Sequence, residues 1–257
     1  MNNKITNNQL DLNCDMGELK SGHTKNYDAA IMPYISSCNI ACGFHSGSPL
    51  LIENTIKSAI KHKVKIGAHP SYNDRENFGR VSIEMDFKVL KAELRYQIGA
   101  LKSMVESLGQ RLNHVKAHGA LYNDLMQNAS LAELFVGVVK EIDPRLKIYV
   151  LAHSEAEKSC EAVEMEFVRE GFADRRYQKL QQLRSRQFED AVIHNTDEVL
   201  AQVGHFVVGK VKLYDGNICP INVETICLHS DTKGAVDLAK NIYQYLKSNN
   251  VKIDATN

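Results

Sequence analysis

The sequence predicts an α/β fold in which parallel strands alternate with covering helices in one domain, residues 1–257. The length of 257 residues is usual for a single (β/α) barrel rather than for two smaller domains. Apolar strand segments are repeatedly followed by helical segments, with no long linker and no shift in composition. We therefore expect a TIM-like barrel, closed or nearly closed, of seven strands or a distorted eight. A doubly wound open sheet is the alternative.

Each element is assigned from its hydrophobic period. Strands are short apolar or alternating runs, and helices carry apolar residues three and four positions apart, as at Leu90, Leu94 and Ile98. Turn residues at 214–217 predict a hairpin, whereas the polar segment 178–189 has no period and is expected to be mobile or partner-facing. The expected strands are 10–13, 36–41, 64–68, one beginning at His114, 146–151, 164–168 and 224–228, and the main helices are 50–62, 86–108, 130–142, 197–208 and 234–246.

The charge balance argues against two classes of partner. Thirty-one basic residues match thirty-one acidic ones, so the chain has no overall positive field to attract nucleic acid or an anionic membrane. The first ten residues are polar, and the sequence contains no apolar run long enough to span a membrane. We therefore expect a cytoplasmic protein that acts on a small molecule or another protein. The sequence leaves the formation of a homo-oligomer open.

Polar side chains recur directly after the predicted strands. On the strand that begins at His114, Lys116 and His118 point to one face, opposite Val115 and Ala117. The carboxyl ends of barrel strands meet at one mouth, so such residues are expected to share a site. Imidazoles with a carboxylate can bind a divalent metal or divide acid and base work. The recurring residues are Asp15, His45, His69, His118, His229 and Asp231, and the candidate metal ligands among them are Asp15, His45, His69 and His118.

Two other motifs do not fit their usual functions. The segment 204–211 approaches a phosphate-binding loop, but Val211 stands where a magnesium-binding hydroxyl is required and a helix precedes the segment. The segment 43–47 resembles a nucleophile elbow, but its central residue is His45 rather than serine. A serine hydrolase is therefore disfavoured.

A set of longer motifs extends from the first strand to the last helix. They are DLNCDMGE at 11–18, NIACGFH at 39–45, GAHP at 67–70, NFGR at 77–80, VKAHGALYN at 115–123, FADR at 172–175 and HSDTKGAV at 229–236. Together they resemble the LamB/YcsF family, whose members form the A component of bacterial ATP-dependent 5-oxoprolinase. The main departure lies at 178–184, where a glycine-containing turn is missing.

The resemblance implies a distorted seven-stranded (β/α) barrel of the glycoside hydrolase or deacetylase type. It also implies cleavage of the 5-oxoproline lactam to L-glutamate with hydrolysis of ATP, used with Mg²⁺, together with B and C subunits. A lactam is stabilised by resonance, so phosphorylation of its carbonyl oxygen would explain the need for ATP. The reaction would take place in a complex, because no nucleotide-binding loop is recognisable in this chain.

The site hypothesis assigns roles within that reaction. Asp15 or a rim histidine would orient or deprotonate the nucleophile, Lys116 would screen the developing negative charge, and His118 or His45 would protonate the leaving nitrogen. Arg80 or Arg175 would hold the substrate carboxylate. The expected catalytic residues are Asp15, His45, His69, Lys116 and His118, and the expected substrate-binding residues are Asp11, Asn13, Asn39, Arg80, Asp174, Arg175, His229 and Asp231.

Two other functions are open besides that of the A component of 5-oxoprolinase. One is a stand-alone deacetylase or amidohydrolase that uses a protein-bound divalent metal and no ATP. The other is a non-catalytic scaffold, which predicts that no small molecule binds at the barrel mouth.

Overall fold

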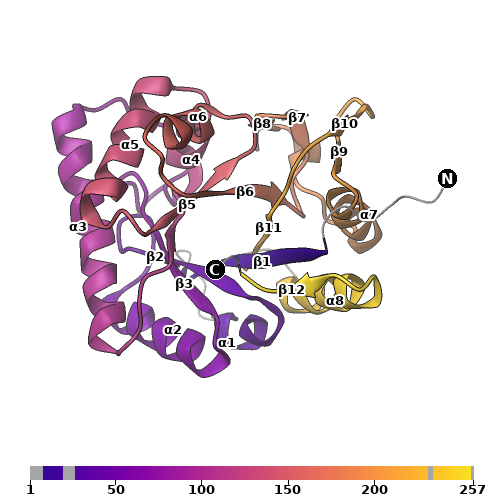
Figure 1. Ribbon diagram of the computed structural model, residues 1–257, viewed down its shortest axis with the longest axis horizontal. Coiled ribbons are helices and arrows are strands. Elements are labelled where there is room, and N and C mark those ends of the chain that lie inside the picture. The colour runs from indigo at the N-terminus through magenta and orange to yellow at the C-terminus, as the bar shows by residue number, and fades with distance from the viewer. Residues whose placement is uncertain (1–7, 20–26, 231–233, 256–257) are drawn as a thin grey trace.

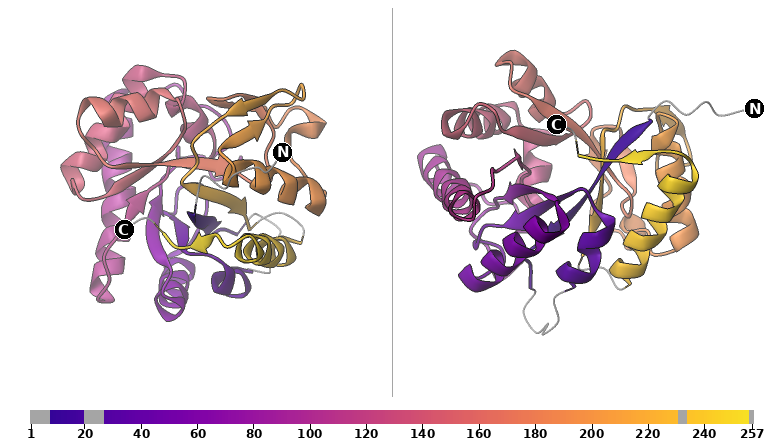
Figure 2. Two further views of the ribbon diagram at one scale, coloured as in Figure 1. Left: turned by 45° about the vertical axis from the view of Figure 1, so that its right-hand side comes forward. Right: turned by 60° about the horizontal axis from the view of Figure 1, so that its bottom comes forward.

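Seven parallel strands form a closed barrel, because the last of them, β11, pairs with both β6 and β1 (Figure 1). The computed structural model describes residues 8–19, 27–230 and 234–255. Helices cover the outside of the strands (Figures 1 and 2). The predicted seven-stranded barrel is confirmed, and the open sheet is wrong. In order around the barrel, the strands are β1 (Gln9–Met16), β2 (Ser37–Ala41), β3 (Lys65–His69), β4 (His114–Val115), β5 (Lys147–Leu151), β6 (Phe167–Phe172) and β11 (Thr225–His229).

The covering helices each bury one apolar stripe, as amphipathic periodicity requires. On α8, for example, Leu238, Ile242 and Leu246 are buried. The chain then ends on β12 (Lys252–Ile253), which pairs with the first two residues of β1 beside the barrel. The helices are α1 (Asp28–Ile31), α2 (Pro49–His62), α3 (Phe87–Ser107), α4 (Gly119–Leu125), α5 (Ala129–Ile142), α6 (Glu155–Ala162), α7 (Thr196–Val207) and α8 (Ala235–Ser248), with 3-10 turns at Met32–Tyr34 and Glu189–Ala191.

The sixth strand lies further along the chain than predicted. The hydrophobic pattern places it at 164–168, but Glu164 adopts a left-handed conformation with φ of 54° after the end of α6. Met165 donates its N–H to the carbonyl of Cys160, which closes the helix end and delays the strand. The strand begins at Phe167 and therefore includes Glu170, a residue that becomes important in the barrel interior.

The segment 178–189, expected to be mobile or partner-facing, is folded against the barrel. Its strand β7 (Tyr177–Lys179) pairs with β8 (Gln182–Leu183), and a second hairpin, β9 (Lys210–Lys212) with β10 (Ile218–Pro220), has the predicted turn. Tyr177 is fully buried, and its hydroxyl accepts a hydrogen bond from the N–H of Phe172 at 3.0 Å. Tyr177, which anchors this segment, lies just before it, so the composition of residues 178–189 alone gives no sign that they are ordered.

The interior of the barrel is polar rather than apolar. Along β1, apolar side chains alternate with Asp11, Asn13 and Asp15, all of which are buried. The contacts of these three cross the barrel: the hydroxyl of Tyr149 on β5 donates to Asp11 at 2.9 Å, for example. Because buried polar groups are costly unless they are paired, the interior must be satisfied by hydrogen bonds between strands.

A continuous hydrogen-bond network provides those partners. Asp11 also accepts from Ser37 at 2.7 Å and from Thr225 at 2.6 Å. One level higher, the side-chain amide of Asn39 donates to Asn13 and to Asp15, both at 2.8 Å. The network therefore fixes the strand register from the floor of the barrel upward to Asp15.

Gly67 is required by the side chain that packs across it. A Cβ atom at this position would lie 2.1 Å from Nε2 of His114, whose ring stacks on Tyr149 and pairs with Asn39. The ring is buried on all sides, so it cannot move away without breaking these contacts.

We predict that Gly67→Ala lowers the free energy of unfolding by about 1–3 kcal/mol, the usual cost of overpacking a core. The matched control is Gly137→Ala on α5, where a Cβ meets nothing within 4 Å and helix propensity favours alanine by about 0.5–1 kcal/mol. Urea unfolding of both variants measures the difference. A Gly67→Ala midpoint equal to that of the wild type would contradict the packing constraint.

Candidate active site

A cavity of about 490 Å³ opens at the carboxyl ends of the barrel strands. Its wall combines acidic groups, imidazoles and arginines with apolar side chains, so it suits a small polar molecule that carries negative charge. The charged, aromatic and hydrogen-bonding side chains of the wall include Asp15, Glu18, His69, Arg80, Lys116, His118, Tyr122, Phe172, Arg175 and His229. They come from five barrel strands and the loops that follow them.

A buried ion-pair cluster forms the base of this cavity. The ammonium of Lys116 lies 3.0 Å from Oδ1 of Asp15, 2.8 Å from Oε1 of Glu170 and 3.0 Å from Sγ of Cys227. Burial opposes the charged form, but Asp15, Cys227 and Glu170 hold the pKa of Lys116 well above its usual value. Burial would also raise the pKa of Asp15, but the charges of His69 and Lys116 hold it well below its usual range. Asp15 is therefore ionised at neutral pH.

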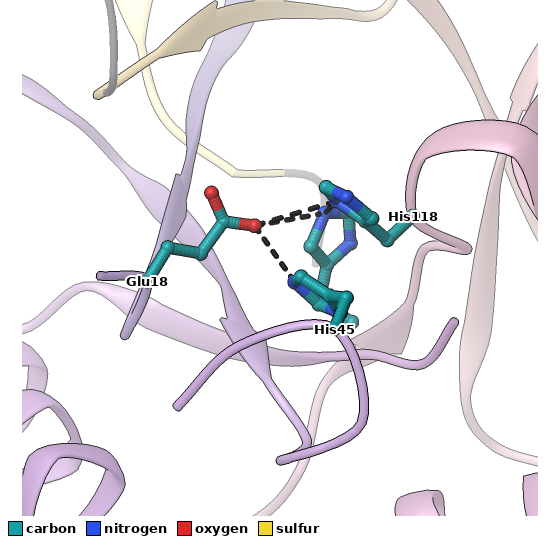
Figure 3. A group of neighbouring side chains, drawn as sticks. Glu18, His45 and His118 are labelled. Atoms are coloured by element: carbon teal, nitrogen blue, oxygen red, sulfur yellow. Dashed lines mark hydrogen bonds and ion pairs between the residues drawn. The ribbon is translucent and has the colours of Figure 1, made fainter. Parts of the chain in front are cut away.

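Three histidines and one glutamate lie beside Asp15. Oε1 of Glu18 is 2.9 Å from Nε2 of His45, 3.3 Å from Nδ1 of His118 and 3.9 Å from Nε2 of His69. Figure 3 shows the carboxylate of Glu18 directed toward the rings of His45 and His118, which stack with centroids 3.7 Å apart. One ligand atom from each of the four residues falls within 4.8 Å of all the others.

Backbone carbonyls fix which ring nitrogens carry hydrogen. Nδ1 of His69 donates to the carbonyl of Lys116, and Nε2 of His118 donates to the carbonyl of Phe78, both at 2.8 Å. Nε2 of His69 lies 3.0 Å from Nδ1 of His118 and 3.3 Å from Oδ2 of Asp15, so the hydrogen on this Nε2 is donated to them and would have to leave for a cation to bind both nitrogens. Burial holds the pKa of His45 and His118 well below the usual value, which favours neutral rings. This donor set fits a divalent cation, for which neutral imidazoles oriented by carbonyls are usual ligands.

The carbonyl that orients His118 depends on a strained loop. Phe78 has φ of 58° and Gly79 has φ of 63°, so two consecutive residues are left-handed. This conformation is unfavourable for phenylalanine and persists where surrounding contacts impose it. The carbonyl of Gly79 accepts the N–H of Ala120, and a Cβ on Gly79 would lie 2.9 Å from both His118 and His45. The loop 77–80 therefore contacts His118 and fixes the position of its ring.

Three of the predicted substrate-binding residues lie below the cavity. Asp11, Asn13 and Asn39 are fully buried below it, and their side chains are engaged in the interior network. Their polar atoms are already used between strands, which argues against direct contact with the substrate. Their role is to hold Asp15 and the strands around it.

The other predicted residues reach the site in different ways. Arg80 and His229 line the cavity, whereas Asp174 is buried behind His229 and bonds to its Nδ1. Arg175 also lines the cavity, but its Nε and Nη2 donate to the backbone carbonyls of Ala191 and Arg184, and burial lowers its pKa to about 10. Two nitrogens of the Arg175 guanidinium group are thus already used in hydrogen bonds within the protein, which reduces what it can offer to a substrate carboxylate. Asp231 lies outside the described residues.

The catalytic predictions also divide. Asp15, His69, Lys116 and His118 line the cavity, but His45 does not, so His45 can act there only through its neighbours. Lys116 is 2% exposed and enclosed by its counter-ions, which makes it the charge centre of the barrel rather than a mobile rim group.

Sequence reasoning missed three residues of the site. Glu18 lies in an acidic loop whose composition alone is typical of a solvated turn, Glu170 falls beyond the predicted strand, and Tyr122 belongs to a motif that assigns it no role. Tyr122 lines the cavity, and burial together with the charge of Glu170 raises the pKa of its hydroxyl well above the usual value. The alternation of Val168, Glu170 and Phe172 signals an inward carboxylate once the strand is placed correctly.

The fold and the cavity together define a (β/α) barrel protein with carboxylates, imidazoles and an ammonium group gathered at the carboxyl ends of its strands. Comparison with known proteins identifies its relatives. The model of the LamB/YcsF family matches residues 10–257, and the chain belongs to this family. No helix in the described parts of the chain is both long and apolar enough to cross a membrane.

Relatives of known name cover almost the whole chain. The A subunit of 5-oxoprolinase from Bacillus mycoides is 40% identical over 250 residues, which is 96% of this chain and 98% of that protein. The corresponding protein of Bacillus cereus, which has the same name, is 40% identical over 248 residues, with the same coverage. The crystal structure of a lactam utilization protein from Thermus thermophilus superposes with a TM-score of 0.89 at 33% identity, covering 96% of this chain and all of that one.

We predict that Lys116→Met lowers the free energy of unfolding by about 3–5 kcal/mol at neutral pH, because it leaves buried carboxylates unpaired. In the wild type, the depressed pKa of Asp15 means that its contribution is complete above about pH 4 and is lost as the pH falls further. In the variant, Asp15 loses its counter-ion and takes up a proton more readily, so the deficit shrinks on acidification toward about pH 5.

Urea unfolding across this pH range measures the effect, with Lys91→Met as the control because Lys91 forms an exposed pair with Glu141. A deficit in Lys116→Met that does not change with pH would argue against a buried charge cluster.

Proposed function

We propose that this chain is the A component of a multi-subunit 5-oxoprolinase that uses ATP to cleave the lactam of 5-oxoproline and give L-glutamate. The proposal depends mainly on one observation: 40% identity across 96% of the chain to a protein named as the A subunit of 5-oxoprolinase. The cavity supports it, because it offers an ionised carboxylate, histidines and arginines to a small anionic amide. The partners are subunits B and C, and the whole chain 1–257 acts as one barrel domain.

The proposed chemistry begins with activation of the lactam carbonyl. Resonance makes the amide carbon a poor electrophile, and transfer of a phosphoryl group from Mg²⁺-bound ATP to the carbonyl oxygen would remove that resistance. The arginines of the cavity wall suit the carboxylate and the phosphoryl group, because a guanidinium pairs with both. Asp15, held ionised by Lys116, is the residue placed to orient and deprotonate the attacking water. An enzyme that consumes ATP is expected in the cytoplasm.

Glu18, His45, His69 and His118 are proposed to hold a divalent cation beside this carboxylate. Such a cation would polarise the substrate oxygen and stabilise negative charge on it. The set replaces the sequence-based one by exchanging Asp15 for Glu18. Oδ1 of Asp15 is paired with Lys116, whereas the carboxylate of Glu18 faces the imidazoles directly.

The alternative function is a stand-alone metal-dependent deacetylase or amidohydrolase on a small amide. The cluster of three histidines and a glutamate favours it, because this donor set would serve such an enzyme without ATP. The two functions differ in one measurable requirement, namely whether amide cleavage depends on ATP and partner subunits.

We predict that the chain, mixed with the B and C subunits from its own source, releases glutamate from 5-oxoproline only when ATP and Mg²⁺ are present. Enzymatic determination of glutamate checks this, with each component omitted in turn as the control. Release by the isolated chain without ATP would instead support the amidohydrolase.

We predict that the isolated chain binds one Zn²⁺ or Mn²⁺ per molecule, and that Glu18→Gln and His69→Asn weaken the affinity by about 10–100-fold or more. Loss of a ligand removes a direct bond to the cation, so both changes should act alike. Isothermal titration with the metal salt measures affinity without any assay of activity.

The controls are Glu53→Gln and His62→Asn on α2, because neither residue belongs to the cluster. Equal metal affinity in the cluster variants and the controls would refute the cation site.

A further inference from the structure

A histidine at the end of β11 and an aspartate in the turn after β6 form a pair on the other side of Asp15 from Glu18, His45, His69 and His118. In the pairing of β6 with β11, Phe172 is opposite Cys227. His229 ends β11 two residues after Cys227, and Asp174 lies in the turn two residues after the end of β6, where its carboxylate contacts the ring of His229. The two strands thus place them side by side without any long loop.

The pair has the geometry of an oriented imidazole. Nδ1 of His229 lies 3.0 Å and 2.9 Å from the two carboxylate oxygens of Asp174. Burial alone would raise the pKa of Asp174, but the nearby His229 lowers it, so the carboxylate is charged. The backbone carbonyl of Asp174 accepts the N–H of Ile193, which fixes the backbone of the turn that carries this carboxylate. Asp174 therefore fixes both the orientation and the tautomer of the ring.

The other ring nitrogen of His229 is directed toward the cavity. The side chain is 12% exposed and lines the cavity wall, whereas Asp174 is 1% exposed behind it. Nε2 lies 3.9 Å from Oδ2 of Asp15, and the ring lies against Phe172 with centroids 6.0 Å apart. A substrate bound in the cavity over these two groups would therefore meet a carboxylate and an imidazole next to each other.

The remaining cavity histidines are not suited to donating a proton to the substrate. His69 donates from Nδ1 to a backbone carbonyl, and His118 does so from Nε2. Their second nitrogens face each other and the carboxylates of the cluster, and His45 does not reach the cavity wall. The expectation that His118 or His45 protonates the leaving nitrogen therefore conflicts with the hydrogen bonds of these rings.

We propose that His229 is the general acid that protonates the lactam nitrogen, and that Asp174 is its positioning residue. This assignment rests on the proposed function. Water forms the new C–O bond to the carbon of the phosphorylated lactam and passes a proton to Asp15. As the C–N bond breaks, its electron pair goes to nitrogen and the new hydroxyl loses its remaining proton to solvent, which leaves an acyl phosphate. A second water then hydrolyses this acyl phosphate and releases inorganic phosphate. Nε2–H of protonated His229 supplies the proton that the amine requires, and solvent reprotonates the ring for the next cycle.

The test uses the reconstituted enzyme with 5-oxoproline, ATP and Mg²⁺. For His229→Asn we expect kcat to fall by about 10²–10⁴-fold, as for loss of a general acid, with KM changed less than about threefold. Imidazole added to the buffer should restore part of the rate, which a structural role would not allow. For Asp174→Asn we expect the same pattern in kcat and KM with a smaller loss. The control is His194→Asn, because His194 is exposed and lies outside the cavity wall.

The outcomes separate the two proposals. If the wild-type complex releases no glutamate, the proposed function is wrong and the proton-donor role falls with it. If the wild type is active and His229→Asn keeps its kcat, or loses activity only through KM without rescue by imidazole, the role of His229 alone is wrong. Urea midpoints close to that of the wild type establish that each variant is folded, and a second variant, His229→Gln, is used if His229→Asn is not.

Discussion

The enclosed ammonium of Lys116 is the interaction on which the rest of the site depends. It lies inside the barrel between two carboxylates contributed by the two strands that flank β11, Asp15 on β1 and Glu170 on β6. Without it, two buried negative charges would face each other, at a cost the fold could not absorb cheaply. With it, Asp15 stays ionised in a place from which water is largely excluded. The barrel thus uses one cation to keep a reactive carboxylate available.

Around that carboxylate, the two sides of the cavity are specialised. On one side, Glu18 and three histidines bring one possible ligand atom each within 4.8 Å of one another, which would suit a cation. On the other, Asp174 holds His229 with one nitrogen directed toward the cavity. A resistant amide needs both kinds of help, since its oxygen must accept negative charge while its nitrogen accepts a proton. The positions of the groups match this division of labour.

The sequence predicted the barrel and the residues near its mouth better than it predicted how deep each side chain lies inside the barrel. Alternation along the expected strand 10–13 places Asp11 and Asn13 on one face and leaves Asp15 to the loop that follows. The strand β1 instead continues to Met16, and of these three residues only Asp15 reaches the cavity. Four residues of strand separate Asp11 from Asp15 by about 13 Å, and no local pattern reports where along that length the wall opens. Glu18 follows the strand in a loop, where no period constrains its direction. The expected strand 164–168 leaves out Glu170, because the left-handed turn at Glu164 delays the start of β6.

The hydrogen-bonded layer at the bottom of the barrel interior determines how a ligand can enter and leave the molecule. Asp11, Ser37, Tyr149 and Thr225 fill the interior from wall to wall beneath Asp15, and all four are buried. A ligand that enters at the mouth cannot leave through this layer, so the reactant and the product must both pass through the mouth of the cavity. Any protein that docks over the mouth would control substrate binding and product release together.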